Sequence, residues 1–193
     1  MRDSKNMVIG MLCAVVCVMA VAYAAFGTAL NVKTTATVAS NWCIRAEKVE
    51  PNCTVTPLAT GVQEGVTAKV EIDANSLGAV VTMNFIQPGD TATCTVNYTN
   101  CGDLNAALTH KVLNTTGGSS TNVEIDSVTG TATYRTADNG IEFTVTGLNV
   151  NTLAKTASTP ITITARYLDV DNQSSPEIKT ASISIQSSAS QSV

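Results

Sequence analysis

Residues 87–98 read QPGDTATCTVNY, a turn signal that leads directly into an alternating segment. Pro88 fixes the φ angle that the second position of a type II turn requires, and Gly89 tolerates the positive φ of the third position. After the turn, every second side chain is suited to burial on a common face: Ala92, Cys94, Val96 and Tyr98. A period of two is typical of a half-buried β-strand. This stretch therefore predicts a strand that begins after a sharp turn.

Short segments of the same kind occur on both sides of this stretch. Alternation or a short apolar run predicts strands at residues 66–72, 78–86, 104–113, 123–128, 131–135, 141–146, 160–168 and 178–185. Asn139-Gly140 is a hairpin signal between two of them. Such a series predicts an all-β fold, a two-sheet antiparallel sandwich of jelly-roll-like or immunoglobulin-like topology. The lone Trp42 does not lie between paired cysteines, which argues against a true immunoglobulin domain.

An uncharged apolar run precedes the strand-rich part of the chain. Arg2 and Lys5 come before roughly twenty residues without a charge, which is the length of a bilayer-spanning helix. Positive charges ahead of such a run direct the rest of the chain out of the cell. Residues 22–24 read AYA, which predicts signal cleavage between Ala24 and Ala25. An uncleaved signal anchor, which would hold the protein at the membrane, is the alternative.

An alternating segment follows the expected cleavage site. Leu30, Val32 and Val38 lie on one face of it, with polar side chains between them. The expected organisation has three parts: a signal peptide or signal anchor at 1–24, a jelly-roll-like β-sandwich at 25–186 and a disordered Ser-rich tail at 187–193. Cleavage would make the alternating segment the first strand of the mature protein.

Four of the six cysteines lie in the exported part of the chain. An even number in an exported domain predicts two disulfides, with three possible connectivities. We favour Cys43–Cys53 and Cys94–Cys101, because each pair closes a short loop between neighbouring stretches. A zinc site is the alternative, but the spacings are too wide for CxxC knuckles and no histidine is nearby.

Composition and the few candidate catalytic residues argue against several classes of function. The net charge of −4 and the lack of clustered Lys and Arg argue against nucleic-acid binding. His110 is the only histidine, and a lone histidine among strands is more often a surface or packed residue than a catalytic base. Residues 169–172 read DVDN, but the Gly and Glu of an EF-hand are missing. A looser calcium site at Asp169 and Asp171 stays open, and we expect no enzyme activity and no cofactor.

Five short stretches before residue 103 read YAAF at 23–26, LNV at 30–32, ATVASNW at 36–42, QPGDT at 87–91 and VNYTNCG at 96–102. In this order they resemble the TasA/camelysin-like exported proteins of Gram-positive and related bacteria, which a SipW-type signal peptidase processes. The likeness covers residues 7–108. It implies a jelly-roll domain, an extracellular location and, as in the best-known members, assembly into matrix fibres in which the N-terminal strand of one subunit completes the sheet of the next. The chain departs from the family in its four exported cysteines and its shorter body. It also lacks an HExxH motif, so the protease activity attributed to camelysin-like members is not carried over.

Two functional hypotheses follow for a protein at the cell surface or outside a bacterium. The first is a fibre or biofilm-matrix subunit that assembles by donation of the N-terminal strand, with Leu30, Val32 and Val38 as anchors. The second is a membrane-anchored or secreted sandwich that binds a glycan or a partner protein. The expected partners are copies of the same chain or other cell-surface proteins, without nucleic acid, and with the membrane contacted only through the N-terminal segment.

Overall fold

The computed structural model describes residues 2–27, 41–48, 50–58, 65–73, 77–118, 120–138, 140–149, 152–170 and 178–192, without the side chains of 2–5 and 22–27. The chain divides into two compact units, Met1–Ala39 and Ser40–Val193. The first contains helix α1 and the second contains all the described strands.

Helix α1 (Arg2–Gly27) contains the charged residues Arg2 and Lys5 and the apolar run that follows them. The helix expected at the N-terminus is thus confirmed. Among the residues that the structure describes, no helix combines the length and the hydropathy that crossing a bilayer requires. The expected membrane span is therefore not confirmed. Ala24 and Ala25, on either side of the expected cleavage bond, lie in the last part of α1.

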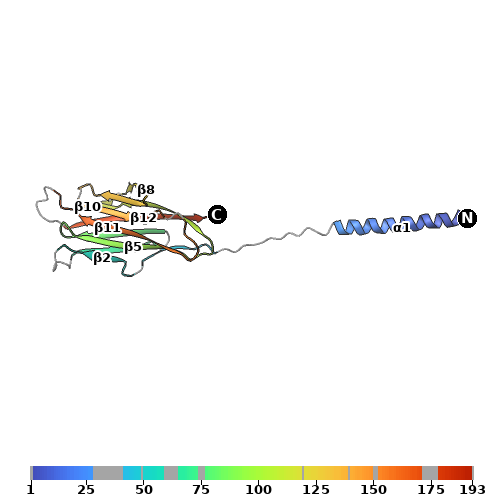
Figure 1. Cartoon of the computed structure of the whole chain (residues 1–193), viewed down its shortest axis with the longest axis horizontal. Helices are drawn as coiled ribbons and strands as arrows, with labels where there is room; N and C mark the ends of the chain where they lie inside the picture. Colours follow the sequence, from blue (N-terminus) through green and yellow to red (C-terminus); the bar gives the residue numbers. More distant parts are fainter. Residues whose placement is uncertain are drawn as a thin grey trace. The chain divides into compact units, whose positions relative to one another are not determined.

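The first sheet contains the strand that the turn signal predicted. In β5 (Thr91–Asn100), the predicted inward residues Ala92, Cys94, Val96 and Tyr98 are all buried. The strand order is β1-β5-β11-β10-β9-β8, with β1 Ile44–Glu47, β11 Ser158–Tyr167, β10 Ile141–Thr146, β9 Thr131–Arg135 and β8 Ile125–Asp126. Figure 1 labels β5, β8, β10 and β11 of this sheet. A further strand, β2 (Cys53–Thr56), pairs with the first residues of β5, while β1 pairs with its last residues. All of these pairings are antiparallel.

The second sheet is also antiparallel. Its order is β3-β4-β12-β6-β7, with β3 Thr67–Ile72, β4 Leu77–Phe85, β12 Lys179–Gln191, β6 Ala106–Asn114 and β7 Thr121–Val123. A short 3-10 helix, η1 (Thr116–Gly118), follows β6. The strand predicted at 123–128 is divided between the sheets, because the chain leaves β7 at Val123 and enters β8 of the first sheet at Ile125.

The inner faces of both sheets contribute to one hydrophobic core. Among its largest fully buried aliphatic side chains are Ile161 and Ile163 of β11 and Ile183 and Ile185 of β12. Each such side chain contributes about 1.5–3 kcal/mol by leaving water. The all-β, two-sheet antiparallel prediction is therefore confirmed.

The Pro-Gly turn connects the two sheets, because β4 and β5 belong to different ones. It has the type II form that the sequence predicts: Gly89 has a φ of 97°, and Asp90 N–H donates to the Gln87 carbonyl at 3.2 Å. Asp90 is only 1% exposed. Its carboxylate accepts hydrogen bonds at 3.0 Å from the main-chain N–H groups of Leu58, Ile86 and Gln87. The turn is thus fixed by a buried acceptor that satisfies three donors.

The predicted disulfide connectivity is wrong. Cys43 is bonded to Cys101, and Cys53 to Cys94. Cys53 and Cys94 are direct cross-strand partners in the register of β2 and β5. Cys43 comes just before β1, and Cys101 comes just after the end of β5 with which β1 pairs. Strand pairing, rather than closeness in the sequence, brings these sulfur atoms together.

The predicted tail is also corrected by the structure. Residues 187–191, expected to be disordered, form the second half of β12 and pair with β6 as far as Gln191↔Ala106. The main chain provides these hydrogen bonds, so a Ser-rich sequence without an apolar pattern can still complete the strand. Ile178, expected on the buried face, precedes β12 and is 75% exposed.

Candidate functional site

The residues predicted to act in assembly lie mostly beyond the reach of the structure. The proposed anchors Leu30, Val32 and Val38 are outside the described residues, which resume at Asn41. The described chain enters the sandwich directly after this segment.

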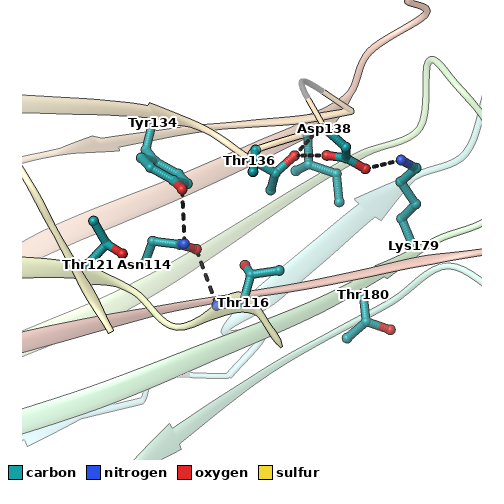
Figure 2. Close-up of a pocket in the computed structure, with 10 residues that line it drawn as sticks. Asn114, Thr116, Thr121, Tyr134, Thr136, Asp138, Lys179 and Thr180 are labelled. Carbon is teal, nitrogen blue, oxygen red and sulfur yellow. Dashed lines mark hydrogen bonds and ion pairs between the residues drawn. The ribbon is translucent and has the colours of Figure 1, made fainter. Parts of the chain in front are cut away.

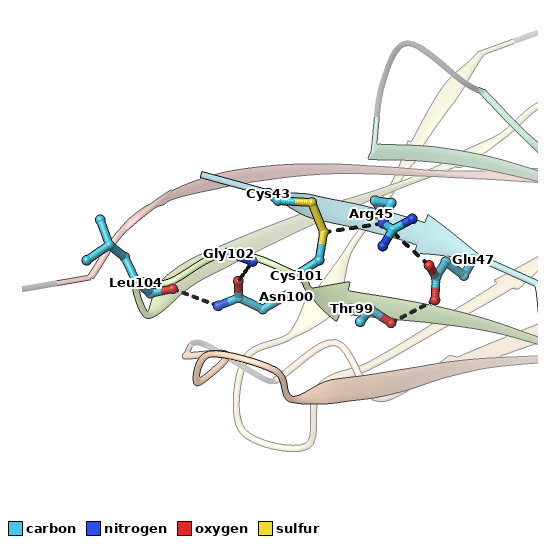
Figure 3. The surroundings of a disulfide bond; sticks show 8 residues. All are labelled: Cys43, Arg45, Glu47, Thr99, Asn100, Cys101, Gly102 and Leu104. Carbon is cyan, nitrogen blue, oxygen red and sulfur yellow. Dashed lines mark hydrogen bonds and ion pairs between the residues drawn. A yellow bond between two sulfur atoms is a disulfide. The ribbon is translucent and has the colours of Figure 1, made fainter. Parts of the chain in front are cut away.

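At this point the chain is fastened to the end of β5 (Figure 3). Asp103 N–H donates to the Asn41 carbonyl at 2.9 Å, and Asn41 N–H donates to the Asp103 carboxylate at 3.3 Å. Cys101 N–H donates to the Cys43 carbonyl at 2.9 Å, alongside the disulfide between these two residues. Three hydrogen bonds and one disulfide, all made by Asn41 and Cys43, thus hold the start of the sandwich in place.

The Asn-Cys-Gly sequence at 100–102 organises the adjoining loop. Asn100 is fully buried, and its Nδ2 donates to the carbonyls of Leu104 at 2.8 Å and Leu153 at 3.0 Å. Its Oδ1 accepts from Gly102 N–H at 3.0 Å. A Cβ atom at Gly102 would lie 2.6 Å from the Asn41 carbonyl oxygen, so only glycine fits beneath the incoming chain. The motif thus joins the end of β5 to the loop that carries Leu153.

Strand β6 follows β5 in the chain, and its outer edge is only partly paired. Ala106 and Leu153 exchange both main-chain hydrogen bonds, with N···O distances of 2.9 and 2.7 Å. Residues Val112–Asn114 pair with β7. Alternate residues of a strand direct their N–H and C=O groups to the same side, so those of Leu108 and His110 also face this edge. No strand in the described part of the chain pairs with them. We call the stretch from Leu108 to His110 the open edge of β6.

The side chain of His110 lies on the buried side of this open edge. It is 8% exposed, and its Nδ1 is 2.7 Å from Ser187 Oγ in the second half of β12. Its ring is edge-on to Tyr98, with centroids 5.3 Å apart. Nε2 is buried and has no hydrogen-bond partner among the described residues. Burial lowers the pKa of His110 below its ordinary value. His110 is therefore a neutral, packed residue at neutral pH.

A polar cleft lies at the other end of β6, between the two sheets (Figure 2). Its polar walls come from residues distant in the sequence, among them Asn114, Tyr134, Asp138 and Lys179. No sequence motif connects these residues, so the pattern of the chain gave no signal for them. Only the meeting of β6, β9, β10 and β12 at this point brings them together.

The calcium prediction obtains no support from geometry. Asp171 is outside the described residues, and Asp169 follows the end of β11. The described part of the chain contains no group of three or more His, Cys, Asp or Glu side chains that could hold a metal ion.

Comparisons with protein-family models, with curated proteins and with solved structures found no match to this chain.

Proposed function

We propose that this protein is an exported structural subunit that assembles with copies of itself into a fibre or matrix at the bacterial cell surface. The carrying observation is the open edge of β6, where Leu108 and His110 direct main-chain donors and acceptors to a side on which no described strand pairs. Unpaired main-chain groups at a sheet edge are a template for another strand. As part of this proposal, the sandwich has the jelly-roll topology that the family resemblance implies.

The occupant of this edge is the N-terminal segment of a second copy. A strand inserted between Leu153 and β7 would exchange four main-chain hydrogen bonds with Leu108 and His110. It would place alternate side chains over the core, where the buried Leu108 and Val112 are its neighbours. Leu30 and Val32 supply apolar side chains with this period. A net gain of about 0.5–1.5 kcal/mol for each hydrogen bond, added to the apolar burial, provides the association energy.

Export and cleavage prepare the donor. The apolar run of α1 serves as the export signal, and cleavage between Ala24 and Ala25 frees the segment that follows. Two disulfides, Cys43–Cys101 and Cys53–Cys94, fit an oxidising compartment outside the cytoplasm. N-terminal sequencing of the protein recovered outside the cells should find Ala25 as the first residue.

Assembly is tested with two variants that add the same charge on opposite faces of the donor. Val32→Asp places a carboxylate on the face directed to the core, where it has no partner, and should abolish the polymer. Thr35→Asp places it on the other face and should leave assembly intact. Electron microscopy and sedimentation of the exported protein measure the outcome. Equal polymerisation of both variants would exclude donation in this register.

Hydrogen exchange identifies the acceptor. The amides of Leu108 and His110 should exchange much more slowly in the polymer than in the Val32→Asp protein. Those of Thr109 and Lys111 face β12 and should be protected in both, which provides an internal control. A monomer in which Leu108 and His110 are already protected would mean that the chain fills its own edge, and the proposal would be wrong.

A further inference from the structure

The polar cleft between the sheets has the size and composition of a small-ligand site. Its volume is about 490 Å³, within the range of about 300–1,000 Å³ that is usual for such sites. It is lined by Asn114, Thr116, Thr121, Tyr134, Thr136, Ala137, Asp138, Ile141, Lys179 and Thr180. Hydroxyl, amide and aromatic groups thus surround a cavity that could hold one or two sugar rings.

Two polar pairs join the sheets across the cleft and fix its walls (Figure 2). Asn114 Nδ2, from β6, donates to Tyr134 Oη, from β9, at 3.1 Å. Lys179 Nζ, at the start of β12, donates to the carboxylate of Asp138 in the turn between β9 and β10. Each pair therefore connects one sheet to the other, and the cleft lies between the pairs.

Two of the lining side chains are buried polar groups that hydrogen bonds hold in one orientation. Asn114 is 5% exposed, and its Oδ1 accepts from Thr116 N–H at 3.2 Å. Thr136 is 7% exposed; its hydroxyl accepts from Ile141 N–H at 3.0 Å and donates to Asp138. Polar groups fixed by such bonds lose little conformational entropy when a ligand binds.

The charges of the cleft cancel. Lys179 and the Thr136 hydroxyl hold the pKa of Asp138 at about 2, so the carboxylate is ionised and paired at neutral pH. This carboxylate would repel an anion. A metal cation would have Asp138 as the one carboxylate ligand among the lining residues. An apolar ligand would bury hydroxyl and amide groups without partners, which is unfavourable. The lining therefore favours a neutral ligand that both donates and accepts hydrogen bonds.

We propose that this cleft binds a neutral saccharide, with the ring of Tyr134 against one face of a sugar and the amide of Asn114 and the threonine hydroxyls bonded to its hydroxyl groups. Tyr134 Oη accepts from Asn114, so the phenol hydrogen can be donated to the ligand. This binding is independent of strand donation, because the open edge of β6 lies in the other half of that strand.

Calorimetric titration of the full-length protein with neutral trisaccharides tests the proposal. The probes are cellotriose, maltotriose and triacetylchitotriose, with the galacturonic acid trimer as the charged counterpart and a Gly-Ser tetrapeptide as the alternative ligand. At least one of the three neutral trisaccharides should bind more tightly than both the acidic trimer and the peptide. Binding of none of them, or preference for the acidic trimer or the peptide, would overturn the inference.

Variants of adjacent residues locate the binding. Tyr134→Phe keeps the ring but removes one hydrogen-bonding group and should weaken binding about fivefold. Tyr134→Ala should abolish it. Thr133→Val changes the neighbouring residue, whose side chain points to the opposite face of β9, and should leave affinity unchanged. Thermal unfolding of each variant shows whether the fold is retained. Equal affinity in a folded Tyr134→Ala variant would mean that the two polar pairs only join the sheets.

The balance of charge between Asp138 and Lys179 should determine the preference for a neutral ligand. Asp138→Asn removes one negative charge from the lining of the cleft, so the acidic trimer should gain affinity relative to the neutral trisaccharide that binds best. An unchanged ratio of the two dissociation constants would mean that the charge of Asp138 does not determine the preference for a neutral ligand.

Discussion

Replacing Asp90 by alanine should destabilise the sandwich severely, because one buried carboxylate satisfies three main-chain donors. Its two oxygens accept from Leu58, Ile86 and Gln87, each at 3.0 Å. A hydrogen bond to a charged acceptor contributes about 1.5–3 kcal/mol, which gives about 5–9 kcal/mol if all three are lost completely. Leu58 is 66% exposed, so its N–H can bond to water instead. We therefore expect a loss of about 3–5 kcal/mol in the free energy of unfolding.

Urea unfolding followed by circular dichroism measures this loss, with equal m-values as the check that both proteins unfold in the same way. Asp90→Asn keeps one acceptor oxygen and should fall between the alanine variant and the original protein. Asp126→Ala is the matched control, because Asp126 also accepts from main-chain N–H groups in a turn but is exposed. If Asp90→Ala loses no more stability than Asp126→Ala, burial of the acceptor does not have the importance that we assign to it.

Three further predictions concern the disulfides and pH. Peptide mapping without reduction should recover Cys43 bonded to Cys101, and replacing both by serine should cost about 4 kcal/mol, the chain-entropy value for a separation of 58 residues. Burial lowers the pKa of His110, so the unfolded state binds more protons than the folded state. The stability due to this residue is therefore present above pH 6.5 and is lost as pH falls towards the pKa of the folded state. The free energy of unfolding, measured from pH 8 to 5, should show this loss, and His110→Asn should make its pH dependence flatter. The pKa of Asp138 is lowered from 3.8 to about 2, so its contribution to the free energy of unfolding is present above pH 3.8 and is lost as pH falls to about 2. Acid titration of Lys179→Met should show a smaller loss of stability in this range.

Much of the strand content could be predicted because local alternation and burial agree. Val66 and Val70 ahead of and within β3, and Ile183 and Ile185 in β12, lie on the buried face as the period of two requires. A period of this kind is a local property, so it is visible without knowledge of the partners of the strand.

The partners of each strand, and the contacts between the sheets, could not be predicted in the same way. Cys53 meets Cys94 only because β2 lies along the first half of β5, and the short-loop criterion contains no information about that register. Ser188 and Ser190 have no apolar pattern, yet their main chain pairs with β6. The cleft has the same origin, since Asn114 and Tyr134 meet only after both sheets have formed.

The disulfide between Cys43 and Cys101 has a mechanical consequence. A force applied to the chain ahead of Asn41 reaches the sandwich at Cys43, and the covalent bond transfers it directly to the end of β5, in the interior of the first sheet. The hydrogen bonds between β1 and β5 would otherwise break one after another, because they lie in the path of the load. With the disulfide intact, the sandwich resists the force as a whole. After reduction, the hydrogen bonds between β1 and β5 would break one after another. Single-molecule extension of the protein before and after reduction should therefore show a lower unfolding force in the reduced state, and an unchanged force would exclude this load path.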